Sequence, residues 1–181
     1  MSKPEDRLLR DGRRPDLDAF MDFVRELEKE TPRGVVIIAC ATIDDLLGRL
    51  IELFLIDHKA VDELLTGPLS AFSARIKSAV SLGLINDEEY RDCEALRKIR
   101  NAFAHSVKVS FTEQRIKDLC KNLRFFGDTY MNRKITVEGV FRLSAGAIME
   151  SLINRMYTVR QRRLQTQSWV PDRNRSKRQT N

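Results

Sequence analysis

Three polar residues near the end of one predicted helix have side chains that could act on a phosphodiester. They are Arg100, Asn101 and His105, within the segment Arg100-Asn-Ala-Phe-Ala-His105. Histidine exchanges protons near neutral pH, and arginine can stabilise the negative charge that develops on a phosphorane. Because the ribose 2′-hydroxyl supplies the nucleophile, an arginine and a histidine suffice in principle to cut RNA without a metal ion.

The helical positions of these residues predict that they do not all face one ligand. On a helical wheel centred on Leu96, Arg100 lies at about 40°, on the margin of the core stripe. Asn101 and His105 lie at about 140° and about 180°, on the opposite side. Catalysis would therefore need a two-fold dimer that packs two copies of the helix around one cleft.

Structural roles for the same residues remain open. A guanidinium beside a core stripe needs a partner or an interface, since an isolated buried charge is costly. Asp44 lies off the polar stripe of the predicted central helix and is the candidate ion-pair partner of Arg100. His105 could instead interact with the carboxyl end of its own helix, where cations are favoured.

The elements that would position these residues are all helices. Apolar periodicity predicts an all-α, single-domain bundle of about six to seven helices. A helix over residues 34–56 is apolar almost all round and is expected at the centre of the bundle. The other predicted helices cover residues 16–29, 59–65, 69–82, 86–105, 112–123 and 136–161. The bundle domain spans residues 16–164, between a flexible arm (1–15) and a basic, disordered tail (165–181).

Four local signals mark the predicted helix ends. Asn86 and Glu89 have the spacing of a capping box, and Thr136 can cap the last helix. Gly83 can adopt the left-handed conformation that ends a helix. Pro32 is expected to end the first helix, because proline lacks a backbone donor and restrains the residue before it.

The net charge of +6 is concentrated near the C-terminus. From residue 155 onward there are eight basic residues and one acid, which leaves 24 basic and 25 acidic residues, a net charge of −1, in residues 1–154. Such a basic tail can bind nucleic acid by counterion release. The candidate nucleic-acid contacts are Arg160, Arg162, Arg163, Arg173, Arg175, Lys177 and Arg178.

Several classes of site and location are disfavoured by the composition. The three cysteines, Cys40, Cys93 and Cys120, do not have metal-ligand spacing, and the chain has two histidines, so we expect no metal site and no cofactor. The longest apolar run, residues 35–41, is too short to span a membrane. The N-terminal residues lack a secretory signal pattern, so we expect a cytoplasmic protein that does not associate with membranes.

Two stretches of the chain resemble the mannitol operon repressor family. They are Leu69-Ser-Ala-Phe-Ser-Ala-Arg-Ile-Lys-Ser-Ala-Val-Ser-Leu-Gly-Leu-Ile-Asn-Asp-Glu-Glu-Tyr90 and Leu96-Arg-Lys-Ile-Arg-Asn-Ala-Phe-Ala-His-Ser106. The approach Asp62-Glu-Leu-Leu65 to Gly67-Pro-Leu69 fits as well, and the resemblance covers residues 34–160. It implies a transcriptional regulator.

The segment from Arg100 to His105 also resembles the Arg-x4-His signature of the HEPN helical-bundle superfamily. Many members of that superfamily are dimeric ribonucleases of toxin–antitoxin and defence systems, and others are binding modules without activity. This resemblance implies that Arg100 and His105 would be the catalytic pair, with Asn101 as the polar residue after the arginine.

The residues do not provide a helix that could read DNA. The body is nearly neutral, and the apolar central helix cannot enter a groove. We therefore predict a repressor or co-repressor that acts mainly through protein contacts, is a homodimer and has a further protein partner. The alternatives are a metal-independent ribonuclease of the HEPN type and an inactive interaction module of the same fold.

Overall fold

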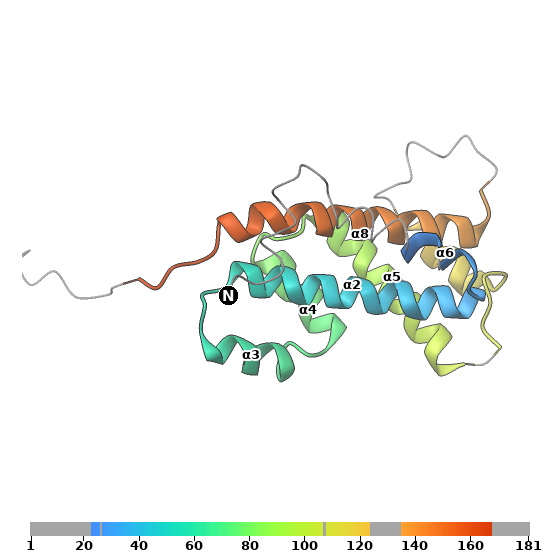
Figure 1. Ribbon diagram of the computed structural model, residues 1–181. Coiled ribbons are helices and arrows are strands. Elements are labelled where there is room, and N and C mark those ends of the chain that lie inside the picture. The colour runs from blue at the N-terminus through green and yellow to red at the C-terminus, as the bar shows by residue number, and fades with distance from the viewer. Residues whose placement is uncertain (1–22, 26, 107, 124–134, 168–181) are drawn as a thin grey trace, which may run out of the picture.

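The structure is a computed structural model, and it describes residues 23–25, 27–106, 108–123 and 135–167. Within these ranges it contains helices and no strand, in agreement with the predicted all-α bundle (Figure 1). The described helices are α2 (Pro32–Phe54), α3 (Lys59–Thr66), α4 (Phe72–Ser81), α5 (Asp87–His105), α6 (Gln114–Lys121) and α8 (Val137–Gln161). The predicted arm at residues 1–15 and most of the tail lie outside the described residues.

Helix α2 occupies the centre of the bundle, as its apolar sequence predicts. It packs against α4, α5 and α8, and α8 lies along much of its length (Figure 1). The side chains of Val36, Ile43 and Leu47 are among those on α2 that are fully buried. At one end of the core, the rings of Phe103 and Phe141 both contact Phe111, with ring centroids 5.1 and 5.6 Å apart.

The start of α2 differs from the prediction. The helix was expected to begin near residue 34, but it begins at Pro32. The helical residues before it end at residue 28, so the predicted end of the preceding helix is confirmed. Proline is favoured in the first turn because the missing N–H would have no helical acceptor there and its φ is already helical. Thr31 is the N-cap, and its hydroxyl accepts a hydrogen bond from the N–H of Gly34 at 3.1 Å.

The other predicted helix ends are confirmed. Asn86 and Glu89 form a reciprocal capping box at the start of α5, and Thr136 caps α8. Gly83, between α4 and α5, has a φ of +68°. That left-handed conformation lets the chain turn sharply after α4, so the first turn of α5 begins close to the end of α4.

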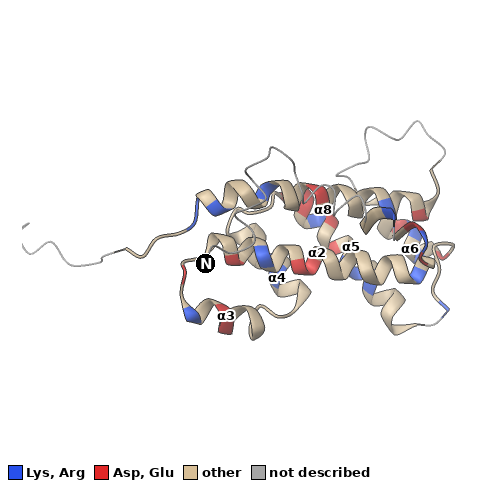
Figure 2. Cartoon of the chain, viewed as in Figure 1, with Lys and Arg blue, Asp and Glu red and all other residues tan. Residues whose placement is uncertain are grey.

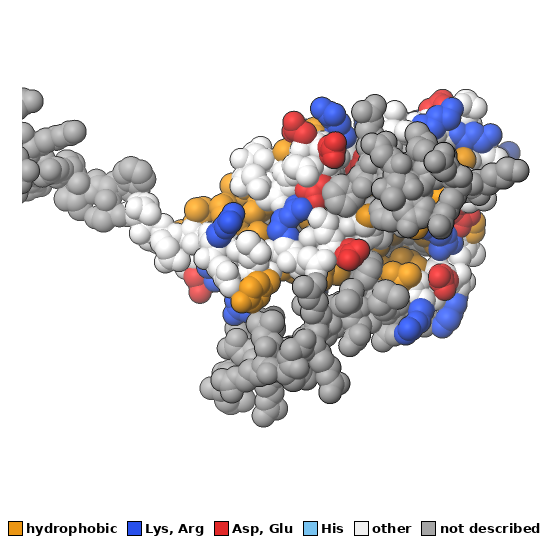
Figure 3. Space-filling model, turned by 90° about the horizontal axis from the view of Figure 1, so that it is seen from above, with side chains coloured by type: hydrophobic (Ala, Val, Ile, Leu, Met, Phe, Trp, Pro, Cys, Tyr) orange, Lys and Arg blue, Asp and Glu red, His pale blue; other side chains and the backbone are white. Residues whose placement is uncertain are grey.

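Charged residues are distributed over the outer faces of the helices, with acidic and basic residues interspersed (Figure 2). Seen from above, the surface formed by the described residues also mixes both signs with hydrophobic side chains (Figure 3). None of the described helices is long and apolar enough to cross a membrane.

Candidate functional site

The last two turns of α5 carry Arg100, Asn101 and His105. As the helical wheel predicts, Ile99 and Phe103 are buried, Arg100 is half-buried and His105 is exposed. Asn101, which the wheel placed on the side of His105, is half-buried like Arg100. The guanidinium of Arg100 donates from Nη1 to Oδ1 of Asn101 at 3.1 Å. The structure thus joins Arg100 to Asn101 and places His105 one turn further on, at the exposed end of the helix.

Asp44 does not form the predicted ion pair with Arg100. Its carboxylate pairs with Arg75, with 3.0 Å between Arg75 Nη1 and Asp44 Oδ1. Arg75 reaches Asp44 by lying across Gly48, whose missing side chain leaves room for the guanidinium. Burial raises the pKa of Asp44, although the nearby charges of Arg75 and Arg100 act in the opposite direction.

Arg75 also fixes the segment before α4. Its Nε donates to the carbonyl oxygen of Leu69 at 2.8 Å, and its Nη1 donates to the backbone carbonyl of Asp44 at 3.2 Å. One side chain therefore connects α2 to the entry of α4, which is why Arg75 is better placed than Arg100 to pair with Asp44.

The carboxyl end of α5 is held by Arg33, in the first turn of α2. Its guanidinium donates to the carbonyl oxygens of Phe103 and Ser106, the latter at 2.5 Å. These carbonyls lie where a helix runs out of its own N–H donors, so an external cation stabilises them. Arg33, rather than the His105 side chain, performs this role, and the imidazole of His105 remains exposed.

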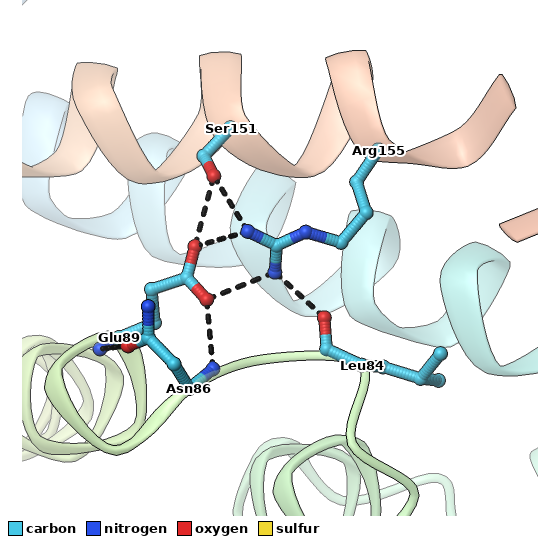
Figure 4. Close-up of polar contacts among 5 residues, drawn as sticks. All are labelled: Leu84, Asn86, Glu89, Ser151 and Arg155. Carbon is cyan, nitrogen blue, oxygen red and sulfur yellow. Dashed lines mark hydrogen bonds and ion pairs between the residues drawn. The ribbon is translucent and has the colours of Figure 1, made fainter. Parts of the chain in front are cut away.

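A second polar cluster, which the sequence reasoning missed, connects α5 to α8 (Figure 4). The carboxylate of Glu89 is 1% exposed and accepts from both Nη atoms of Arg155, at 2.6 and 2.9 Å. It also accepts from the hydroxyl of Ser151 at 2.8 Å and from the N–H of Asn86 at 2.9 Å. Arg155 donates further to the carbonyl of Leu84 at 2.6 Å.

This network lowers the pKa of Glu89. Burial alone would raise it, but the hydrogen bonds from Arg155, the Asn86 N–H and Ser151 together outweigh that effect. The capping box had identified one role of Glu89. Its pairing with Arg155, 66 positions along the chain, has no local sequence signal.

The basic residues at the end of α8 and just after it have different roles. Arg160 and Arg162 are exposed, as nucleic-acid contacts would require. Arg163 instead donates from Nε to the carbonyl of Leu55 at 2.8 Å, and the N–H of Leu164 donates to Phe54 at 2.8 Å. The last carbonyls of α2 lack helical donors, and this segment supplies them.

Arg163 is therefore an anchor of the chain to the end of α2, and it is not part of a free basic tail. The remaining predicted tail contacts, Arg173, Arg175, Lys177 and Arg178, lie outside the described residues.

Two candidate chemistries, metal binding and thiol reactivity, concern the His, Cys, Asp and Glu side chains of the described residues. No group of three or more His, Cys, Asp or Glu side chains there could hold a metal ion. Burial raises the pKa of the thiols of Cys40 and Cys120 to about 12 and raises that of Cys93 as well. All three thiols are buried, so they remain protonated near neutral pH and are poor nucleophiles.

Comparison with known proteins identifies the family. The family model described as mannitol repressor matches residues 18–161, which include every described helix. The chain belongs to the mannitol repressor family. Searches of curated proteins and of solved structures found no match. The family match extends over the Arg100–His105 end, the Glu89–Arg155 network and the Asp44–Arg75 pair alike.

Proposed function

We propose that this chain is a transcriptional regulator, a repressor or co-repressor of the mannitol repressor type, that acts mainly through protein–protein contacts in the cytoplasm. Membership of the mannitol repressor family supports the regulatory role. The mode of action is inferred from the surface of the bundle, and from the start of α5 in particular.

The α4–α5 pair has the short connection expected of a helix-turn-helix unit, but its second helix is unsuited to DNA. A recognition helix contacts base edges with its N-terminal residues. The first turn of α5 consists of Asp87, Glu88 and Glu89, and two of these carboxylates are exposed. Phosphates would repel them. Further along α5, Cys93, Leu96 and Ile99 are buried in the core, so that face is unavailable to a groove. This acidic first turn is the observation that carries the proposal.

Because the described residues provide no DNA-reading helix, we propose that the regulator acts on another protein. On the face seen in Figure 3, the described residues carry both charges interspersed with hydrophobic side chains, a composition compatible with a protein interface. We propose a homodimer that binds a protein partner, with sequence-independent assistance from exposed basic residues such as Arg160 and Arg162.

A reporter assay tests this proposal. Deletion of the gene should raise transcription of a mannitol operon, and the full chain supplied in trans should restore repression. A variant with Arg173, Arg175, Lys177 and Arg178 replaced by Gln should still repress, because the tail assists binding without supplying the regulatory contact. Cross-linking in the same cells should recover a transcription-related protein with both chains. Unchanged transcription in the deletion strain would refute the regulatory role, and loss of repression in the Gln variant would refute action through protein contacts.

A metal-independent HEPN-type ribonuclease is the second candidate, and one observation favours it. No carboxylate of the described residues lies within ion-pair distance of Arg100, whose guanidinium binds the Asn101 amide and keeps donors available for a phosphate. His105 is exposed about one turn further along α5 and could be shared across a dimer.

The ribonuclease candidate predicts cleavage of mixed RNA in EDTA by the purified chain. Arg100→Ala and His105→Ala should each abolish the cleavage. Lys98→Ala is the matched control, because Lys98 is an exposed cation on the same helix. Intact RNA at micromolar protein, or equal loss of cleavage in all three variants, would eliminate this candidate.

A further inference from the structure

A cavity of about 830 Å³ opens between the α4–α5 turn, the C-terminal half of α8 and the end of α2. Its lining includes Leu82, Asn86, Asn154, Arg155, Thr158 and Arg162. Cavities of several hundred Å³ are the size that binds small metabolites. No established site of the chain accounts for this one.

The charges around the cavity favour an anion. The residues that line the cavity include two arginines, Arg155 and Arg162, and one acid, Glu89. Arg155 neutralises Glu89 through two hydrogen bonds, which Figure 4 shows, and both residues line the cavity. Arg162 is exposed, and its guanidinium forms no hydrogen bond or ion pair with the described residues, so its charge is available to a ligand.

The remaining polar groups suit hydroxyls. Asn154, Thr158 and Arg162 follow one another at intervals of four residues, so they share one face of the C-terminal part of α8. Amide and hydroxyl side chains both donate and accept hydrogen bonds, as sugar and polyol hydroxyls require. Phe54 and Leu82 add apolar surface that can contact the carbon chain of such a ligand.

The hydrogen bonds between Glu89, Arg155 and their neighbours form without a ligand, so these residues can serve as a rigid wall of the cavity. Both carboxylate oxygens of Glu89 are occupied, and Arg155 uses both of its Nη atoms on Glu89, Ser151 and Leu84. The Nε–H of Arg155 makes no hydrogen bond with the described residues, and it remains as a further donor for a ligand. Preformed walls of this kind reduce the ordering cost of binding.

We propose that this cavity binds a small phosphorylated polyol or sugar, with the phosphate at Arg162 and a hydroxyl at Thr158. The choice of polyol rests on the proposed function as a regulator of the mannitol repressor type. The ligand would bind where α5 begins and where the chain after α8 is anchored to α2 through Arg163, so its binding site adjoins three elements of the bundle.

Isothermal titration of the purified full chain tests the site, with mannitol 1-phosphate, mannitol and inorganic phosphate as probes. We expect mannitol 1-phosphate to bind at least about tenfold more tightly than either of the other two, since each lacks one half of the recognised group. Equal binding of mannitol would refute the role of the anion, and equal binding of inorganic phosphate would refute the role of the hydroxyls.

Variants locate the binding within the molecule. Arg162→Gln should weaken mannitol 1-phosphate binding about tenfold or more, and Thr158→Val should weaken it by a smaller factor. Arg160→Gln is the matched control, because Arg160 is an exposed arginine two positions away that does not line the cavity. No binding of mannitol 1-phosphate at millimolar concentration, or an equal effect of the two arginine variants, would overturn the proposal. These measurements involve no transcription, so their failure would leave the reporter result for the proposed function unaffected.

Discussion

Glu89, in the first turn of α5, and Arg155, in the last third of α8, form an ion pair with a buried carboxylate and contacts of 2.6 and 2.9 Å. The same guanidinium donates to the carbonyl of Leu84 in the α4–α5 turn. The pair therefore connects two long helices and the turn between α4 and α5, and it also forms one wall of the cavity proposed to bind a ligand.

Replacement of Arg155 should destabilise the bundle strongly. Arg155→Ala leaves the carboxylate of Glu89 buried without its cation, and breaking a buried ion pair from one side costs about 3 kcal/mol. Chemical denaturation measures this loss. Arg160→Ala, an exposed position one turn further along α8, should cost less than about 0.5 kcal/mol. Equal stability of the two variants would show that the pair contributes little to the fold.

The lowered pKa of Glu89 predicts how stability depends on pH. The pKa of an unfolded glutamate is about 4.3. The pKa of Glu89 in the folded state is lower, so the folded state favours the carboxylate. This stabilisation is fully present above the unfolded pKa and is lost as the pH falls through the folded pKa. The free energy of unfolding should therefore decrease less steeply below about pH 5 in Glu89→Gln than in the natural chain. Parallel curves for the two proteins would contradict this assignment.

The contribution of Asp44 to the free energy of unfolding should depend on pH with the opposite sign. Burial raises its folded pKa, so protonation stabilises the folded state and the contribution declines as the pH rises through that pKa. Asp44→Asn should cost less than about 1 kcal/mol at neutral pH, because the amide keeps a hydrogen-bond acceptor for Arg75 and needs less solvation than the carboxylate. A loss as large as that of Arg155→Ala would contradict the difference between the two sites.

Gly48 and Arg75 should be energetically coupled. An added Cβ at Gly48 would lie 3.1 Å from Cζ of Arg75, which is closer than ordinary contact. In an Arg75→Met background, Gly48→Ala should stabilise α2 by about 1 kcal/mol through helix propensity alone. In the natural chain that gain should be offset by displacement of the guanidinium. A double-mutant cycle should give a coupling of about 1 kcal/mol, and additive effects would show that Arg75 moves aside without cost.

How far the sequence predicts the structure depends on whether a feature is local. The apolar period of α2, the capping box at Asn86 and the left-handed Gly83 are all determined within a few residues, and the structure confirms each of them. The start of α2 was placed near residue 34 instead of at Pro32, because a proline that stops one helix is also favoured in the first turn of the next.

The sequence did not predict which charged side chains of different helices contact each other. A helical wheel identifies Asp44 as an acid in need of a partner, but it does not reveal which cation of another helix will reach it. Arg75 does so because Gly48 leaves room for its guanidinium. Arg155 and Arg163 were counted only as basic residues near the C-terminus, whereas contacts 66 and 108 positions away make them part of the bundle.

The absence of a DNA-reading helix among the described residues is central to this account, and DNA binding by the purified chain tests it most directly. Fluorescence anisotropy at physiological salt would compare DNA from upstream of the mannitol operon with a scrambled duplex of equal length. We predict that the two dissociation constants agree within about twofold, and that the Gln variant of the four tail cations weakens both equally. Binding of the operon DNA more than about tenfold more tightly than the scrambled duplex, by the chain alone, would contradict regulation through protein contacts.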